Sequence, residues 1–395
     1  MALSILFTVS IGAQILDACP FAAGQIAVLH GTGANGRVDI YSLSPGTSLG
    51  GGNLTAGSSS NRSIGKINAT HLAISDQNTT TSVIFETGSL SGSNFTGTDF
   101  NAFDRPQQIA GDSTLGVAFS TAFSSSQLIK FTTSAVSLVP VLGGGINANS
   151  SAFSCITSKG DGSSRWILGT VDGRIIEITD TGFVVSNYCV TPNLGITTSN
   201  AITGLHYITG GWLTVCTNEG FIYLINHDTQ TILQCVQYGP VGSYPMVSRD
   251  GGIGMVSSQN ANNSISHLME WDVIRTPMEQ KQLAWTNTSN PKAIGYDTSG
   301  YAWAASGTQL LIFTMTGFRS TTPQTELCTN PGSVQGLTTI IDDSAGAGLA
   351  EVLFQTTLAA GGQPVPVTTG LSSILKIASI DQGTEEKFDC RRTTS

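Results

Sequence analysis

The chain has 395 residues, of which 40% are hydrophobic and only 11% are charged, and its net charge is −9. An average soluble domain is about 25% charged, so Ser, Thr, Asn and Gly must form most of this surface, as in many secreted and virion proteins. Lys and Arg form no cluster, which argues against binding of nucleic acid through its phosphates. No stretch approaches the roughly 20 apolar residues of a membrane-spanning helix.

The first eleven residues have two interpretations. Residues 1–18 resemble a cleaved leader, because Leu16-Asp17-Ala18-Cys19 is similar to a lipoprotein cleavage box. However, no basic residue precedes the apolar run, and an acidic residue is unusual just before a cleavage site. The same residues alternate as a β-strand does, and we favour a retained strand over residues 1–11.

One kind of apolar run recurs along the chain. It contains β-branched and aliphatic residues, and Gly, Asn, Asp and Ser separate the runs. The second residues of the runs lie 45, 45, 47, 47, 46, 42 and 64 positions apart, and they are Val38, Val83, Leu128, Ile175, Ile222, Leu268, Leu310 and Ile374. Six near-equal steps and one long step indicate a structural repeat.

Each run has a second strand just before it, joined by a tight turn. Asp172-Gly173 and Glu219-Gly220 supply the positive φ that such turns need. A weaker strand precedes each pair and another often follows. Four strands in about 45 residues is the period of a β-propeller blade. We therefore expect an all-β propeller of about eight four-stranded blades, with seven as the alternative.

The ends of the chain suggest how the ring closes. The last repeat has a poor fourth strand, which residues 1–11 could supply. The expected organisation is a closing strand over 1–11, a single propeller domain over 12–390 and a tail over 391–395. The segment 359–370 is expected to be a loop rich in Gly and Pro.

The blades around Trp166–Thr181 and Trp212–Gln230 resemble those of quinoprotein-type and lactonase-type propellers. The resemblance covers most of the chain, but only as a pattern. The Gly-His and Trp-Asp marks of WD40 blades are absent, as is a regular Trp motif of quinoprotein blades. Lactonase-type propellers place metal-binding acids at the channel, but no residue here matches that set. Glu177, Lys130, Glu270 and Lys376 do share one position in the aligned runs.

Two glycine motifs are better explained as turns and loops. Gly31-Thr-Gly-Ala-Asn-Gly36 spells a dinucleotide fingerprint, but a strand follows it where a helix would be needed. Gly46-Thr-Ser48-Leu-Gly50 spells a nucleophile elbow, but it lies in a Gly/Ser-rich segment that we expect to be a loop.

No set of residues indicates a metal or cofactor site. The histidines lack metal-ligand spacing and are expected at strand ends or on the surface, at positions 30, 71, 206, 227 and 267. Asp342-Asp343 could bind Ca²⁺, but a solvated turn explains the pair better. The seven cysteines form no C-x-x-C pair. One or two disulfides among Cys155, Cys189, Cys216 and Cys235 remain open against buried thiols.

Eight sites have the N-glycosylation pattern, and five of them are clustered. The clustered sites are Asn53, Asn61, Asn68, Asn78 and Asn94, and the others are Asn149, Asn262 and Asn287. Tyr301 and Trp303 are candidate exposed aromatic contacts for a ligand.

Three functions are compatible with these features. The favoured one is a non-enzymatic structural or binding component of a virion, such as a phage tail or capsid, or of an extracellular assembly. The second is a secreted glycoprotein that binds carbohydrate or a receptor. The third is a secreted lactonase-like or quinoprotein-like enzyme. We expect no catalytic residue, metal or cofactor, and partners that are other proteins of an assembly or surface glycans.

Overall fold

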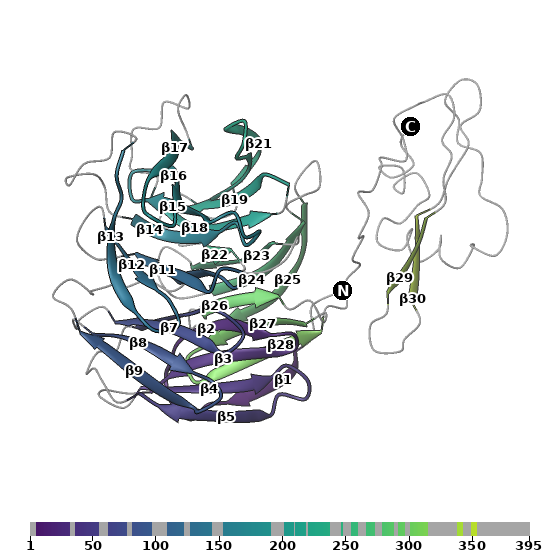
Figure 1. Ribbon diagram of the computed structural model, residues 1–395. Helices are drawn as coiled ribbons and strands as arrows, with labels where there is room; N and C mark the ends of the chain where they lie inside the picture. The colour runs from purple at the N-terminus through teal and green to yellow at the C-terminus, as the bar shows by residue number, and fades with distance from the viewer. Residues whose placement is uncertain are drawn as a thin grey trace, which may run out of the picture. The chain divides into compact units, whose positions relative to one another are not determined.

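A computed structural model gives the fold of the chain (Figure 1). The residues that it describes are 5–31, 36–54, 62–76, 81–96, 109–121, 127–143, 153–190, 201–208, 210–218, 220–237, 246–247, 254–259, 266–272, 279–287, 291–296, 301–314, 338–342 and 349–353. Contacts divide the chain into two compact units. One unit is Ile5–Phe313, and the other combines Met1–Ser4 with Thr314–Ser395.

The described strands of the first unit form seven four-stranded antiparallel sheets, which we number as blades 1 to 7. Blade 1 consists of β2 (Ile15–Ala22), β3 (Gln25–His30), β4 (Arg37–Ser42) and β5 (Ser48–Asn53). Blade 2 consists of β6 (Arg62–Lys66), β7 (His71–Asp76), β8 (Thr81–Glu86) and β9 (Ser91–Thr96). Blade 3 consists of β10 (Ile109–Asp112), β11 (Val117–Thr121), β12 (Gln127–Phe131) and β13 (Val136–Pro140).

Blades 4 to 6 have the same order of strands. Blade 4 consists of β14 (Phe153–Ser158), β15 (Arg165–Thr170), β16 (Arg174–Thr179) and β17 (Val184–Cys189). Blade 5 consists of β18 (Ile202–Ile208), β19 (Trp212–Thr217), β20 (Phe221–Asn226) and β21 (Thr231–Gln237). Blade 6 consists of β22 (Met246–Val247), β23 (Gly254–Gln259), β24 (Ser266–Asp272) and β25 (Glu279–Asn287). Blade 7 combines β26 (Pro291–Tyr296), β27 (Tyr301–Ser306) and β28 (Gln309–Thr314) with β1 (Ile5–Ser10).

The first strands of the blades form a closed ring. Each contacts the first strand of the next blade, in the order β2, β6, β10, β14, β18, β22 and β26, and β26 contacts β2 again. The predicted all-β propeller of four-stranded blades is therefore confirmed. The ring closes with seven described blades, which agrees with the alternative count and corrects the preferred count of eight. The expected eighth repeat falls in the second unit, where β29 (Thr338–Asp342) pairs with β30 (Leu349–Leu353).

The N-terminal strand closes the ring, as predicted, but on a different partner. β1 pairs antiparallel with β28, from Ile5 opposite Phe313 to Ser10 opposite Gln309. The partner expected from the sequence was the repeat after residue 334. Blade 7 has only three strands of its own between residues 291 and 314, so its outer edge takes β1. The expected domain end at residue 390 and the tail lie outside the described residues and stay predictions.

The core lies between the blades, because each sheet buries side chains against its neighbours. Between blades 7 and 1, for example, Trp303 and Leu310 pack with Ile26 and Val28. Glycine permits the closest approaches of the inner strands. A Cβ atom at Gly111 in β10 would collide with the carbonyl oxygen of Lys66 in β6. Among the described residues, no helix has the length and apolar character needed to cross a bilayer.

Hydrogen bonds also join equivalent positions of neighbouring blades. The Ser63 hydroxyl and the Ile64 N–H both donate to the carboxylate of Asp17, at 2.8 and 2.9 Å. The Ser154 hydroxyl donates to the carbonyl of Ile202 at 2.6 Å. Each contact joins residues 46 to 48 positions apart, which is one repeat. The repeat length read from the sequence therefore sets which residues meet across a blade interface.

Candidate functional site

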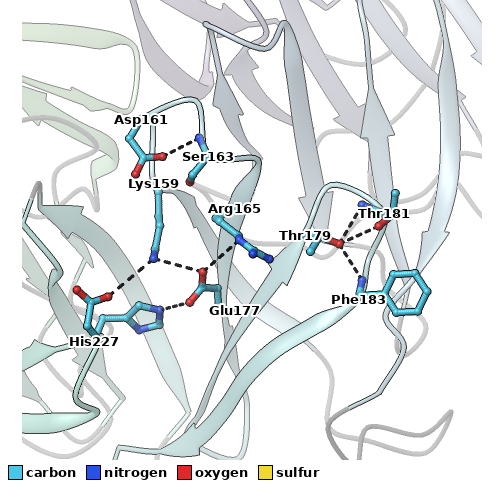
Figure 2. A network of polar contacts seen from close by, with 10 residues as sticks. Lys159, Asp161, Ser163, Arg165, Glu177, Thr179, Thr181, Phe183 and His227 are labelled. Atoms are coloured by element: carbon cyan, nitrogen blue, oxygen red, sulfur yellow. Dashed lines mark hydrogen bonds and ion pairs between the residues drawn. The ribbon is translucent and has the colours of Figure 1, made fainter.

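A buried polar cluster joins blades 4 and 5, and Glu177 lies at its centre (Figure 2). Its Oε1 atom lies 3.3 Å from Lys159 Nζ and 3.8 Å from Arg165 Nε. Its Oε2 atom lies 2.8 Å from His227 Nε2. The other ring nitrogen, His227 Nδ1, lies 2.8 Å from the hydroxyl of Tyr188. We call Lys159, Arg165, Glu177, Tyr188 and His227 the Glu177 cluster.

The antiparallel sheet brings these residues together. Lys159 follows the end of β14, Arg165 begins β15 and Glu177 lies near the end of β16. Because the strands are antiparallel, all three residues lie at the same end of the blade 4 strands. The register confirms the placement, since Arg165 is opposite Thr179 and Ile167 is opposite Glu177. His227 comes from blade 5, where it directly follows β20.

Burial and charge determine the ionisation of the cluster. Glu177 is 7% exposed and His227 is 2% exposed. Burial opposes ionisation of Glu177, but the hydrogen bond with His227 and the charge of Lys159 outweigh it and lower its pKa. Burial raises the pKa of Tyr188, and the charges of Glu177 and Asp228 raise it further. The cluster therefore contains an ionised carboxylate and a neutral phenol.

The protonation of Glu177 assigns the hydrogen bonds of His227. An ionised carboxylate only accepts, so His227 Nε2 must donate to Glu177. In a neutral imidazole the other nitrogen is an acceptor, and the Tyr188 hydroxyl then donates to His227 Nδ1. The row of Tyr, His and Glu resembles a proton relay in outline. Its phenol is a weakened acid, its carboxylate contacts three basic side chains, and the contacts of His227 join blade 4 to blade 5.

A second contact occupies the same place between blades 3 and 4. Lys130 Nζ lies 2.9 Å from the Asp180 carbonyl oxygen and 3.4 Å from its Oδ2. In the aligned repeat Lys130 corresponds to Glu177, and Asp180 corresponds to His227. The position shared by Lys130 and Glu177 therefore contacts the next blade's turn. The side chain of Glu270 and the whole of Lys376 lie outside the described residues.

Three of the four histidines whose side chains the structure describes lie at strand ends, as expected, and only His206 among them does not. His30 and His227 do lie at strand ends, but both are buried and paired with carboxylates. His30 Nε2 lies 2.8 Å from Asp39 Oδ2 within blade 1, and Arg37 Nε lies 2.7 Å from Asp39 Oδ1. His206 lies inside β18 and is also buried, His71 begins β7, and the side chain of His267 is not described. Among the described residues, no three His, Cys, Asp or Glu could hold a metal ion together.

The glycine motifs lie between or within strands. β3 ends at His30 and pairs with β4, which begins at Arg37, so the Gly31–Gly36 motif joins a hairpin as expected. Gly46–Gly50 differs from the expected loop, because β5 begins at Ser48. Strand pairing with β4 fixes these residues, and the helix that a nucleophile elbow requires does not follow.

The two candidate aromatic contacts have different surroundings. Trp303 has no exposed surface, so its expected exposure was wrong. Its indole occupies the space next to Gly295, where a Cβ atom would collide with the ring. Both faces of β27 are buried, and Trp303 lies in the core between blades 7 and 1, whereas Tyr301 is partly buried at the edge of the same cluster. A ligand contact at Tyr301 stays a prediction.

The glycosylation pattern falls on several kinds of position. Asn53 and Asn94 are exposed, in β5 and β9 respectively. The side-chain oxygen Oδ1 of Asn68 accepts hydrogen bonds from the Thr70 and His71 N–H groups in a turn. Asn61, Asn78, Asn149 and Asn262 lie outside the described residues, as does the side chain of Asn287. Glycosylation at all these sites stays a prediction.

The cysteines and the paired acids give no site. Cys155, Cys189, Cys216 and Cys235 are thiols, so the disulfides considered between them do not form. Burial raises the pKa of Cys216, which makes its thiol unreactive. Asp342 ends β29 and Asp343 lies outside the described residues, so Ca²⁺ binding there is not tested.

Comparisons with known proteins identify the fold but no family. No protein-family model matches the chain, and no curated protein matches it. A solved structure that it resembles is the crystal structure of the WD40 β-propeller domain of Doa1, with a TM-score of 0.57 and 14% sequence identity. The match covers 79% of this chain and 97% of the other. Similarity at this identity shows a β-propeller fold, although the WD40 sequence marks are absent.

Proposed function

We propose that this propeller is a non-enzymatic structural or binding component of a multiprotein assembly, either in a virion or outside the cell. The observation that carries the proposal is the Glu177 cluster, in which one buried carboxylate contacts three basic side chains. Its contacts with His227 join blades 4 and 5, and Glu177 and His227 have almost no exposed surface. A buried cluster of this kind supports a rigid ring that presents surfaces to partners.

The charge content of the chain supports the same proposal. Only 11% of the residues are charged, so the surface offers hydroxyl, amide and apolar groups to its partners. β-propellers host many functions, and the fold does not distinguish them. The assignment to a virion or an extracellular assembly therefore rests on composition.

The experiment is native mass spectrometry of the chain isolated from its own source under mild conditions. We expect complexes in which the chain and other proteins occur in fixed stoichiometry, with no bound metal or organic cofactor. A free chain that carries a metal or cofactor would contradict the proposal and favour the lactonase-like or quinoprotein-like enzyme.

A second candidate is a secreted glycoprotein that binds carbohydrate or a receptor. The observation that favours it is the exposure of Asn53 and Asn94, which lie on the outermost strands of blades 1 and 2. Peptide mapping of the same isolated protein tests it. Glycans on these two residues would support the glycoprotein, and unmodified Asn at both would leave the first proposal as the better one.

A further inference from the structure

Four of the outermost strands contain a β-bulge near their beginning. The pairing register shifts in β1, β5, β17 and β21, which are the outermost strands of blades 7, 1, 4 and 5. Each shift leaves one residue of the outer strand without an opposite residue in the neighbouring strand. These extra residues are Leu6, Leu49, Val185 and Leu233, and we call them the bulge residues.

All four bulge residues are apolar and exposed. Leu6 is 40% exposed, Leu49 53%, Val185 48% and Leu233 46%. By contrast, β9 and β13 pair without a register shift, and neither contains an exposed large apolar side chain. A bulge re-aims a side chain of its strand. The exposed apolar side chains therefore accompany the bulges and are a repeated feature of the outer strands.

The bulges favour contact through side chains over the addition of a further strand. A bulge twists an edge strand and is one of the devices by which soluble proteins prevent edge pairing. In blade 4 the beginning of the edge is also occupied. The Leu142 N–H donates to the carbonyl of Gly182, and the Val184 N–H donates to the carbonyl of Leu142, both at 2.9 Å. A partner should therefore contact the bulge residues by their side chains.

Blades 4 and 5 combine their bulge residues with further exposed apolar side chains and with carboxylates. Phe183 is 57% exposed and Ile232 is 41% exposed. In the turns that lead into β17 and β21, the side chain of Asp180 is 40% exposed and that of Asp228 is 64% exposed. The docking patch, as we call it, consists of Asp180, Phe183 and Val185 of blade 4 with Asp228, Ile232 and Leu233 of blade 5.

The basic side chains at this end of the blades are turned inward. The side chains of Lys130, Lys159 and Arg165 are only 20, 13 and 32% exposed. Lys130 Nζ lies 3.4 Å from Asp180 Oδ2, and Lys159 Nζ lies 4.0 Å from Asp228 Oδ1. The two aspartates lie above these bases, so the charge that the docking patch presents to solvent is negative.

We infer that the docking patch binds a protein partner whose surface carries Lys or Arg beside apolar side chains. The apolar residues of the patch require an apolar counterpart, and its aspartates are complementary to basic groups. A second copy in a two-fold contact would place aspartates against aspartates. Anionic lipid headgroups would be repelled in the same way. The inference rests on the proposed assembly function and gives the chemistry of one partner.

The first test uses the native complex isolated from the protein's own source. Hydroxyl-radical footprinting compares the complex with the dissociated chain, and we expect Phe183, Val185 and Leu233 to be protected in the complex. A carbodiimide then joins carboxylates directly to neighbouring amines. We expect it to link Asp228 or Asp180 to a lysine of a different protein, because opposite charges meet at the contact.

The second test measures the chemistry with a defined probe. A short synthetic peptide of Leu and Lys should bind the full chain, and its counterpart of Leu and Glu should not. Replacing both apolar bulge residues of the patch, Val185→Ser with Leu233→Ser, should weaken binding of the Lys peptide at least about tenfold. The matched control is Leu49→Ser, a bulge residue whose preceding turn has no charged residue, and it should bind as the wild type does.

A charge variant separates the two contributions. Asp180→Asn with Asp228→Asn should weaken binding of the Lys peptide and remove most of its dependence on salt, since screening acts on exposed charges. Circular dichroism should show that all variants keep the wild-type fold, because the substituted side chains are exposed.

Several results would overturn the inference. They are a docking patch that stays fully reactive in the native complex, carbodiimide links between two copies of this chain, and Lys-peptide binding that the Ser variant leaves unchanged. Sedimentation of the chain with phosphatidylcholine vesicles would assign the patch to a lipid surface instead. If the native complex has fixed stoichiometry but leaves the patch reactive, the proposed function stands and only this inference fails. A chain isolated without other proteins would contradict both.

Discussion

The interfaces between blades 3 and 4 and between blades 4 and 5 use the same positions with opposite charges. In the first, the base Lys130 extends from the third strand to the acidic turn residue Asp180. In the second, the acid Glu177 extends to the turn residue His227. The repeat therefore fixes where a polar contact forms between blades. The side chains at those positions decide which blade supplies the acid and how strong the contact is.

The two contacts differ in burial and in number of partners. The side chain of Asp180 is 40% exposed, and Lys130 has two oxygen partners on that residue. Glu177 is almost fully buried and contacts three bases. Exposed ion pairs contribute little to stability, whereas removing one partner from a buried network leaves uncompensated charge. The second interface should therefore be far more sensitive to substitution.

Removal of the central carboxylate should have the largest effect. We expect Glu177→Leu to lower the free energy of unfolding by about 3–5 kcal/mol, because it leaves Lys159 and His227 without their buried acceptor. Lys130→Met, at the equivalent position, should lower it by less than about 1 kcal/mol. Chemical denaturation of the two variants and the wild type measures both values. Equal losses would contradict the difference proposed between the interfaces.

A double-mutant cycle isolates the pair itself. We expect Glu177→Gln and His227→Gln to be coupled by about 1–3 kcal/mol, because the two groups share a buried hydrogen bond. The cycle of Lys130→Met with Asp180→Asn should give less than about 0.5 kcal/mol. A coupling energy near zero in the first cycle would show that the contact between Glu177 and His227 does not itself stabilise the fold.

Acid should weaken the second interface. The pKa of Glu177 is lowered in the folded chain from its ordinary value of 4.5, so its contribution is fully present above that pH. The contribution is lost as the pH falls through the lowered pKa. We expect the stability difference between the wild type and Glu177→Gln to shrink from pH 6 toward pH 3, measured by denaturation at each pH. A difference independent of pH would rule out an ionised Glu177 as its source.

The phenol at the far end of the cluster should matter least. Tyr188→Phe removes the hydroxyl that binds His227 Nδ1 and leaves the ring in place, so we expect a loss of about 1 kcal/mol. Tyr207→Phe is a matched control, because the Tyr207 ring also lies against His227. The Tyr207→Phe variant should retain the contact of its ring with His227. If Tyr188→Phe lowered the free energy of unfolding by more than Glu177→Leu does, the expected ranking of the two residues would be wrong.

The sequence predicted the class of fold because the signal is local and repeated. Runs such as those at Leu128, Ile175 and Ile222 do form the third strands of blades. The blade count and the partner of β1 depend on pairings between residues about 300 positions apart, which no local pattern specifies. A run near Ile374 resembled a strand as well as any other, so the sequence alone counted one blade too many.

The Glu177 cluster was only partly visible in the sequence. The shared position of Lys130 and Glu177 was apparent, but its partners were not. Glu177 and His227 lie 50 residues apart, close to one repeat, and comparison of turn residues one repeat later could have found the pair. Trp303 was misplaced for a related reason. Its type suggests a ligand contact, whereas its place in a strand buried on both faces, next to Gly295, puts it in the core.

The closing strand has a consequence for synthesis on the ribosome. β1 emerges early, but its partner Gln309–Thr314 is made roughly 300 residues later. At about 5–20 residues per second, β1 waits for about 15–60 s before it can pair. During that interval the strand presents Ile5, Leu6 and Phe7 to other nascent chains and to chaperones. The step most exposed to misassembly is therefore the last one, when the earliest strand must still be available to complete blade 7.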